Sequence, residues 1–541
     1  MIRPSAVSFV TVPRVLHYRP PIAVHSINSI ITRYQNSHRR VSSSANMAAS
    51  KKDRTYADAI TALNGLQTNF ASLDMARKNA NMNQRSLPEM VEYFRRVGYK
   101  PSDFNKLNIL HVAGTKGKGS TCAFITSILM QYHRSHSFPT KIGTYTSPHL
   151  KAVRERIQIN GKPLSEHLFA KYFFELYDRL EEARNSEGGV EEGGNAMPSY
   201  FRFLTMLSFH VYVSEGVDSV VLEVGVGGEY DSTNVVVEPT VTGITRLGID
   251  HVGVLGRTLG EIAWHKAGIF KKGTKGYSVL QEEEAMSVIE ERAREKGIVF
   301  EKVGVLEAVE GLTLGLAGEF QKGNASLAVK MVEEHMKRCG IEVENGAVLP
   351  AEVKEGLEKA VWKGRCQIIE DEKDQIQWCI DGAHTKESIV EAGKWFASVN
   401  KKGEYKNIIL FFNQQTRDAE QLARDLNEIL KAQFGGDKFT HVYFTTNRTY
   451  SDHTYKPDLV SINVSSSAVD TLTVQKGLAK AWQETGSKAQ VHVMETIQET
   501  VEAIKALEGK SQVLVTGSLH LVGGFLEVVE EDNEPSAMVP N

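Results

Sequence analysis

The chain has 541 residues, more than one hydrophobic core usually supports, so two domains of ordinary size are expected. Its apolar content of 41% and charged content of 24% are ordinary for a globular protein and exclude general disorder. With 63 basic and 66 acidic residues the net charge is −3, so no overall basic field would recruit nucleic acid or an anionic membrane. Any anionic ligand must therefore be held by local charge.

The N-terminal residues differ in composition from the rest. No acidic residue precedes Asp53. Six arginines lie there among Ser, Val and Ile: Arg3, Arg14, Arg19, Arg33, Arg39 and Arg40. This composition is typical of a mitochondrial transit peptide, assigned to residues 1–46, with a disordered tail as the alternative. A second start at Met47 would give a cytoplasmic form, so both the mitochondrial matrix and the cytoplasm are expected. No later stretch has the length and apolarity of an integral membrane segment.

From Asn108 onward, short β-branched runs alternate with longer amphipathic ones, a pattern that predicts parallel sheets covered by helices. Strands are expected at 108–113 and 219–224. The residues after Ser120 carry apolar side chains at helical spacing and predict a helix with one buried face. The Gly- and Glu-rich stretch 185–195 has no periodicity and predicts an exposed loop.

A second βα domain of about 175 residues is predicted to begin near Arg365. Its candidate strands are 377–380, 407–412, 441–445, 491–493 and 512–516. The stretch 434–469, which contains the candidate strand 441–445, is rich in Thr, Ser and Asn, and the sequence does not define its other regular structure. The four cysteines, Cys122, Cys339, Cys366 and Cys379, lack the close spacing of a zinc or redox motif, which favours a reduced compartment.

A phosphate-binding loop is the strongest local signal. Glycine lets a backbone approach phosphate closely, and a helix N-terminus directs N–H groups at it. The loop lies between a predicted strand and a predicted helix, and Lys118 would meet the outer phosphates. It is not the strict Walker pattern, since Val112 replaces the first glycine and Gly119 the hydroxyl residue after the lysine. A Gly/Lys-rich surface turn is the alternative. The residues expected to bind ATP here are Gly114, Thr115, Lys116, Gly117, Lys118, Gly119 and Ser120.

This loop resembles the phosphate loop of the Mur ligase and folylpolyglutamate synthase superfamily. Three further pairs of segments match those of the superfamily in the same order along the chain: 145–150 followed by 154–157, 222–228 followed by 231–234, and 248–251 followed by 264–269. The resemblance runs from Tyr56 to Gly524, and the segment 63–69 is similar to that of eukaryotic folylpolyglutamate synthases. It implies an α/β fold with an N-terminal P-loop, Mur-ligase-like ATPase domain over residues 53–360. A smaller, C-terminal Rossmann-like α/β domain over residues 365–541 would follow.

The resemblance assigns magnesium ligands to Ser147, Glu223 and His251. A metal bound to nucleotide phosphates takes hard oxygen ligands and few protein groups, and Glu223 ends an apolar strand. Taken singly, each residue has a structural alternative: a turn cap, a solvated strand end and a hydrogen-bonded loop histidine. A monovalent cation such as K⁺ is a further possible cofactor.

Lys266 lies where members of the superfamily carry a lysine modified by carbon dioxide to a carbamate. A carbamate requires the neutral amine, and hence a lowered lysine pKa. The alternative is an unmodified lysine that neutralises phosphate or substrate.

Later motifs extend the resemblance into the second domain. It places Asn324, Arg365, Asp381 and His384 against ATP, and an arginine suits phosphate because its fork donates several hydrogen bonds at once. The segment Trp362-Lys-Gly-Arg365 matches a Trp-Pro-Gly-Arg signature with lysine in place of proline, which puts the rigidity of this hinge in question.

The glutamate pocket implied by the resemblance contains His384, Asn413 and Ser518. Loop hydrogen bonds and helix capping are the structural alternative for the last two.

The implied activity is ATP-dependent addition of L-glutamate to the γ-carboxyl of tetrahydrofolate and its polyglutamates through an acyl phosphate. Lys118, His251 and Lys266 would be catalytic. The partners would be reduced folates and L-glutamate, and the chain a monomer. Dihydrofolate synthase, on the same scaffold, is the alternative. A peptidoglycan Mur ligase fits a mitochondrial address poorly, and a P-loop switch or kinase leaves Asp381-Gly-Ala-His384 unexplained. An inactive scaffold would bind ATP without releasing ADP.

Overall fold

The computed structural model describes residues 54–67, 80–136, 138–186, 197–343, 348–400, 403–415, 418–452, 457–459 and 471–533. The predicted transit peptide and the start at Met47 lie outside these residues, as does most of the predicted loop at 185–195. Within the described ranges, no helix is both long and apolar enough to cross a membrane.

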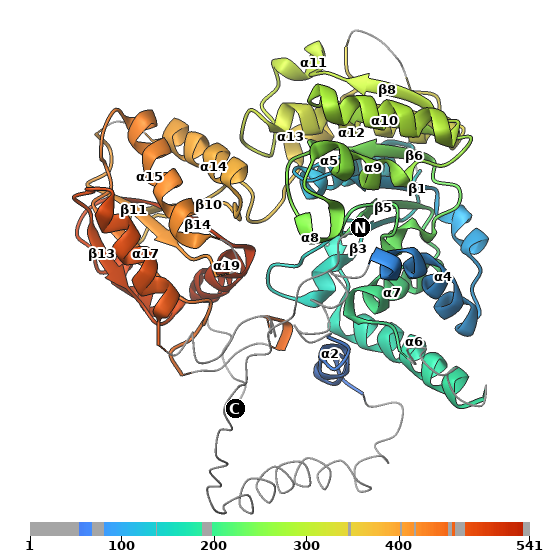
Figure 1. Ribbon diagram of the computed structural model, residues 1–541, viewed down its shortest axis with the longest axis horizontal. Coiled ribbons are helices and arrows are strands. Elements are labelled where there is room, and N and C mark those ends of the chain that lie inside the picture. Colours follow the sequence, from blue (N-terminus) through green and yellow to red (C-terminus); the bar gives the residue numbers. More distant parts are fainter. Residues whose placement is uncertain are drawn as a thin grey trace, which may run out of the picture. The chain divides into compact units, whose positions relative to one another are not determined.

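The first sheet has eight strands in the order β4-β3-β2-β5-β1-β6-β7-β8. Figure 1 shows this sheet with several of its strands labelled. The strands are β1 (Ile109–Ala113), β2 (Ile142–Tyr145), β3 (Ile157–Ile159), β4 (Lys162–Pro163), β5 (Ser219–Glu223), β6 (Val241–Ile244), β7 (Lys275–Val279) and β8 (Val299–Val303). All neighbours pair in parallel except those involving β3 and β4, which form an antiparallel hairpin at one edge. Every residue of β1 and β5 is buried, as expected for central strands covered on both faces.

Helices cover both faces of this sheet. They are α2 (Tyr56–Asn64), α4 (Ala80–Arg96), α5 (Lys118–His136), α6 (Glu166–Ser186), α7 (Tyr200–Glu215), α8 (Val252–Leu255), α9 (Leu259–Lys266), α10 (Glu283–Lys296), α11 (Glu307–Glu310), α12 (Gln321–Arg338) and α13 (Ala351–Lys359). One core joins α5, α12 and α13 to one face. On the other face, α2, α4, α6 and α7 cover β1, β2 and β5, while α9 and α10 pack beside them.

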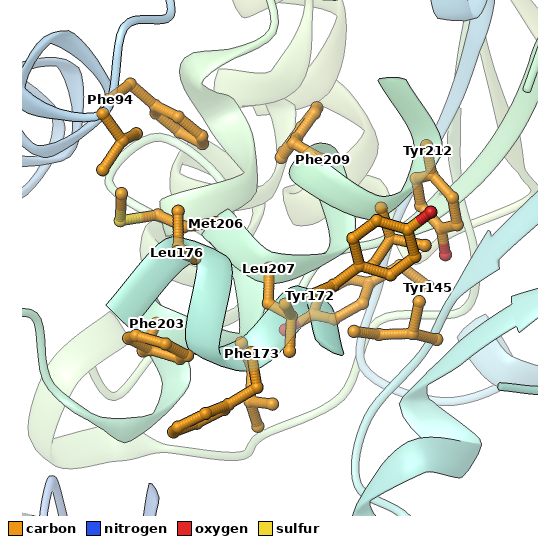
Figure 2. Close-up of a cluster of buried hydrophobic side chains, with 14 of the residues drawn as sticks. Phe94, Tyr145, Tyr172, Phe173, Leu176, Phe203, Met206, Leu207, Phe209 and Tyr212 are labelled. Carbon is orange, nitrogen blue, oxygen red and sulfur yellow. The ribbon is translucent and has the colours of Figure 1, made fainter. Parts of the chain in front are cut away.

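The core beneath α4, α6 and α7 is strongly aromatic (Figure 2). Phe94, Phe173, Phe203 and Phe209 are fully buried, and Phe173 and Phe203 lie with ring centroids 4.8 Å apart. Buried aromatic side chains remove large apolar areas from water, so this core supports the strands that carry the candidate site.

The second sheet has six strands in the order β13-β12-β11-β14-β10-β9. They are β9 (Gln367–Asp371), β10 (Ile376–Ile380), β11 (Asn407–Phe412), β12 (His441–Phe444), β13 (Gln490–Val493) and β14 (Ser511–Thr516). All five predicted strands are present, and β9, which was not predicted, pairs antiparallel to β10. The predicted α/β class, with a sheet in each half of the chain, is confirmed.

Among the described residues, five helices cover the second sheet: α14 (Lys386–Val399), α15 (Ala419–Phe434), α17 (Thr473–Glu484), α18 (Ile497–Lys505) and α19 (Leu519–Asn533). The first three share a core on one face, and α18 and α19 share a core on the other. Both sheets are therefore buried between helical layers, with their loops left to carry polar side chains.

Candidate active site

The predicted phosphate loop connects β1 to α5 and leaves no room for a methyl group at two of its glycines. Gly114 has a φ of +145°, and a Cβ there would lie 1.8 Å from Thr245 Oγ1. Gly117 has a φ of +91°, and a Cβ there would lie 2.2 Å from Asn324 Oδ1. Asn324, one of the residues expected at the nucleotide, thus packs directly against the loop.

We expect Gly114→Ala to destabilise the protein by about 2–4 kcal/mol, because the new methyl group meets a short buried threonine in a strained backbone region. ATP binding should be lost with it. Thermal unfolding and calorimetric ATP titration measure the two effects. Gly248→Ala is the matched control, since its Cβ would be 3.9 Å from the nearest atom, in Thr115. Equal unfolding temperatures for the two variants would contradict the packing argument.

Some backbone donors of the loop are already used. The N–H groups of Thr115 and Lys116 both donate to the Arg246 carbonyl, at 3.1 and 3.0 Å. Inside the helix, the Thr121 N–H donates to the Gly117 carbonyl at 2.8 Å. The first N–H groups of a helix lack intrahelical partners and attract anions. The N–H groups of Gly117, Lys118, Gly119 and Ser120 donate to no backbone carbonyl here, and the geometry leaves them for a phosphate. Any nucleotide contact from Thr115 or Lys116 must come from other atoms, and their role stays a prediction.

Glu223 lies at the end of β5, in register with Val112 of β1, and is 4% exposed. One carboxylate oxygen accepts the Ser147 N–H at 3.0 Å, and the other lies 4.0 Å from Lys118 Nζ. Burial raises the pKa of Glu223, while the Lys118 ammonium and the Ser147 N–H act in the opposite direction. The structure therefore brings two of the three predicted metal ligands together beside the phosphate-loop lysine.

The segment of the third predicted ligand reaches the phosphate loop. Lys116 Nζ lies 3.4 Å from the Asp250 carboxylate, and Thr115 donates its hydroxyl to the Gly248 carbonyl at 3.2 Å. His251 follows at φ +51°, with its N–H donating to Asp250 at 2.9 Å and its side chain exposed. The backbone of His251 is thus close to the loop, and its role as a ligand stays a prediction.

Lys266, the last residue of α9, is buried under the phosphate loop. It is 4% exposed, and its ammonium donates to the Gly114 carbonyl at 2.7 Å. Burial lowers the pKa of Lys266 well below its usual value, and Lys118 acts in the same direction, against Asp250 and Asp231. A lowered pKa favours the neutral amine that a carbamate requires, and the hydrogen bond to Gly114 equally suits an unmodified lysine.

An ion pair that the sequence did not reveal fixes the end of α9. The Glu229 N–H donates to the His265 carbonyl at 2.7 Å, and the Glu229 carboxylate pairs with Arg292 of α10. Arg292 is 7% exposed, and its guanidinium lies 4.5 Å from the ring centroid of Trp264. No local signal marks Arg292, because it is one charge among many on α10. The pair holds Lys266 through its two preceding residues.

A second cluster lies at the carboxyl end of β10. The Asp381 carboxylate accepts the Cys366 N–H at 2.9 Å, and His384 Nδ1 lies 2.9 Å from the Gly382 carbonyl. A Cβ on Gly382 would be 2.4 Å from Arg365 Nη1. Burial raises the pKa of Asp381, while Arg365 acts in the opposite direction. Three residues predicted at ATP therefore converge around one glycine.

Two residues predicted for the glutamate pocket have structural partners. Asn413 is fully buried, donates to Asn447 at 2.7 Å and accepts from Gln475 at 3.0 Å. Ser518 accepts the Leu521 N–H at 3.0 Å and so caps α19. These contacts match the loop bonding and helix capping left open by the sequence, and a glutamate-binding role for either residue stays a prediction.

A phosphate loop on one parallel sheet and an Arg–Asp–His cluster on a second define a two-sheet, P-loop nucleotide-binding protein. Residues 112–311 match the Mur ligase middle domain, and residues 365–528 match the dihydrofolate synthetase C-terminal domain.

The "probable folylpolyglutamate synthase" of Schizosaccharomyces pombe is 44% identical over 90% of this chain and 97% of its own. Folylpolyglutamate synthase of Saccharomyces cerevisiae (strain YJM789) is 46% identical over 88% of this chain and 87% of its own. The structure of Mycobacterium tuberculosis folylpolyglutamate synthase complexed with ADP superposes with a TM-score of 0.65 at 22% sequence identity. The match covers 86% of this chain and 97% of that chain. The chain therefore belongs to the folylpolyglutamate synthase family, ATP-dependent, amide-forming ligases of the Mur ligase type.

Proposed function

We propose that the chain adds L-glutamate to the γ-carboxyl group of tetrahydrofolate and of its polyglutamates while ATP is converted to ADP. The observation that carries this proposal is the phosphate loop, with Lys118 beside the buried Glu223 carboxylate. The names of the curated relatives favour this reaction. The C-terminal residues match a domain named after dihydrofolate synthetase, so glutamate addition to dihydropteroate is the second candidate.

The chemistry follows from the need to activate a carboxylate, which is a poor acyl donor. Transfer of the γ-phosphoryl group of ATP to the folate carboxylate gives an acyl phosphate, with ADP as the leaving group. Such a transfer needs positioning and neutralisation of charge more than covalent catalysis. The N–H groups at the start of α5 and the Lys118 ammonium supply both. The glutamate amine then attacks the acyl carbon and releases phosphate.

Glu223 and Ser147 would hold a magnesium ion, which would neutralise phosphate charge when bound. The fit rests on the donor set: Glu223 Oε2 binds a backbone N–H, and Oε1 faces Lys118 at 4.0 Å. One carboxylate and one hydroxyl suit an ion that keeps several waters and takes phosphate oxygens. His251 as a third ligand and a K⁺ ion belong to the same proposal.

Arg365 would serve the nucleotide from the second sheet. Its positive charge acts on the pKa of Glu223, and it lies against Gly382 of the second cluster. In the proposed reaction Arg365 and Asp381 bind ATP, and His384 orients the nucleotide and the incoming glutamate. Exclusion of water by these groups would protect the acyl phosphate from hydrolysis.

The proposal also covers location and assembly. The composition of residues 1–46 supports import into the mitochondrial matrix, and a start at Met47 supports a cytoplasmic form. We propose a monomer that acts without nucleic acid.

The direct test measures ADP release by the chain starting at Met47, with magnesium, ATP and glutamate. Tetrahydrofolate and dihydropteroate are compared as acceptors, and mass spectrometry identifies the product. We expect glutamyl units on tetrahydrofolate and loss of turnover in Glu223→Ala. Turnover with dihydropteroate alone would establish the second candidate. No ADP release with either acceptor would indicate an inactive nucleotide-binding scaffold.

A further inference from the structure

Lys363 occupies the position of the proline in the Trp-Pro-Gly-Arg signature, and the structure gives this lysine a partner. Lys363 Nζ donates to Glu530 Oε1 of α19 at 2.7 Å. Lys151 Nζ donates to the other oxygen, Oε2, of the same carboxylate at 2.9 Å. Glu530 therefore bridges two lysines that are distant in sequence. Burial acts to raise the pKa of Glu530, but the hydrogen bonds from Lys363 and Lys151 outweigh it and lower that pKa.

A second carboxylate joins the bridge one helical turn earlier. Glu527 is 2% exposed, and its Oε2 lies 3.0 Å from Lys151 Nζ. Residues three apart share one face of a helix, so Glu527 and Glu530 form a single acidic site on α19. Lys151 contacts both carboxylates, and Lys363 contacts the outer one.

Both lysines lie close in sequence to residues of the candidate site. Lys151 follows Ser147 by four residues, and Lys363 precedes Arg365 by two. The backbone around Lys151 is held tightly, because the Glu155 carboxylate accepts the N–H groups of three successive residues, Leu150, Lys151 and Ala152, at 2.8–3.1 Å. A Cβ on Gly523 of α19 would lie 2.1 Å from the Leu150 carbonyl oxygen, so helix and segment are in close contact.

We propose that Lys151, Lys363, Glu527 and Glu530 form an electrostatic tether of positioning residues. The tether holds the Ser147 segment and the Arg365 segment against α19, and so fixes their positions relative to each other. It replaces the stiffness that proline would give residues 362–365 in the Trp-Pro-Gly-Arg signature. It rests on the proposed function, since register matters only if both segments serve one reaction.

The tether should affect rate more than global stability. Ion pairs with partly exposed members contribute little to folding stability, and the Lys363 side chain is 55% exposed. Small displacements of positioning groups, by contrast, lower rates substantially. A selective loss of kcat/KM, with the unfolding temperature nearly unchanged, is therefore the expected signature.

The experiment compares two substitutions of Lys363 that both remove its charge but differ in the freedom they leave to the backbone, with variants of Lys359 and Glu530 beside them. Lys363→Met removes the charge and should lower kcat/KM by about three- to tenfold. Lys363→Pro removes the same charge but restores a fixed φ, so it should keep most of the wild-type activity. Lys359→Met is the charge control, because Lys359 pairs with Glu355 within α13. Glu530→Gln should resemble Lys363→Met.

Salt separates the tether from a general effect of charge. Raising NaCl from about 0.05 to about 0.5 M shortens the screening length severalfold. The ratio of the wild-type kcat/KM to that of Lys363→Met should therefore fall towards one. The ratio of the wild-type kcat/KM to that of Lys359→Met should stay constant over the same range of salt.

Hydrogen exchange tests the tether without any turnover. Backbone N–H groups of residues 147–156 and 364–367 should exchange faster in Lys363→Met and Glu530→Gln than in the wild type or Lys359→Met. If the wild type adds glutamate to neither acceptor, the proposed function fails, and exchange still decides whether the tether exists. Lys363→Met behaving like Lys359→Met in rate, salt response and exchange would overturn the inference.

Discussion

Replacing Lys118 with alanine should lower kcat/KM for ADP release by about 100- to 1000-fold. Lys118 lies at the start of α5, with its ammonium 4.0 Å from Glu223, where charge on a transferring phosphoryl group must be neutralised. Steady-state ADP release with saturating glutamate measures the loss. A loss smaller than about tenfold would mean that the helix N-terminus alone stabilises the phosphates.

The Lys118→Ala variant needs a control for electrostatic damage. Without its ammonium, the pKa of buried Glu223 should rise further, and the unfolding temperature should fall. The double variant Lys118→Ala/Glu223→Gln removes both charges and should recover the unfolding temperature but not the activity. Recovery of activity in the double variant would show that Lys118 acts only by balancing Glu223.

Replacing Lys266 with methionine should reduce activity by about 100-fold or more, whether the native residue is a carbamate or an ammonium. Either form acts directly beneath the phosphate loop, where Lys266 contacts Gly114 at 2.7 Å. ADP release measures the loss, and carbon-13 NMR with labelled bicarbonate distinguishes the forms, since only a carbamate carries the label. Activity near that of the wild type would remove Lys266 from the reaction.

The same variant should change the pH dependence of stability in a defined direction. The native pKa of Lys266 lies well below its unfolded value of about 10.5, so folding releases a proton between those two pH values. Wild-type stability gains from this group as pH rises through that window. Lys266→Met lacks the gain. Its unfolding temperature relative to the wild type should therefore fall as pH rises, and a difference independent of pH would contradict a lowered native pKa.

The elements that the sequence predicted well are those with a strong local pattern. The strand ending at Ala113, the glycine loop and the helix from Lys118 each carry their own periodicity or composition, and they adjoin along the chain. Four strands of the second sheet, β10, β11, β12 and β14, are mostly buried and were found for the same reason, and the edge strand β13 was found although it is only half-buried. The prediction that the helix from Lys118 has one buried face was wrong: seven successive residues from Ser120 to Thr126 are buried, because α12 and α13 pack against the helix as well as the sheet. Strand β9 was missed because Ile368 and Ile369 lie between polar and charged residues at an edge, so its apolar run is too short.

Contacts between distant segments account for what the sequence could not supply. Nothing near Thr115 indicates that its N–H is taken by the Arg246 carbonyl, because 131 residues separate them, from 115 to 246. Asn413 matches a family motif equally well as a pocket residue or as a buried link between loops, and the sequence gives no sign of its partners Asn447 and Gln475. Lys363 likewise looked like a departure from a pattern until its partner on α19 was known.

The glycines of the phosphate loop also limit how this protein can evolve. Every amino acid reached from a glycine codon by one base change carries a Cβ, and at Gly114 and Gly117 that atom would lie within 2.2 Å of a neighbouring side-chain oxygen. A viable replacement would require a second, simultaneous change in Thr245 or Asn324. An inhibitor that contacts the backbone at these glycines would therefore face a surface that single mutations cannot reshape to escape it.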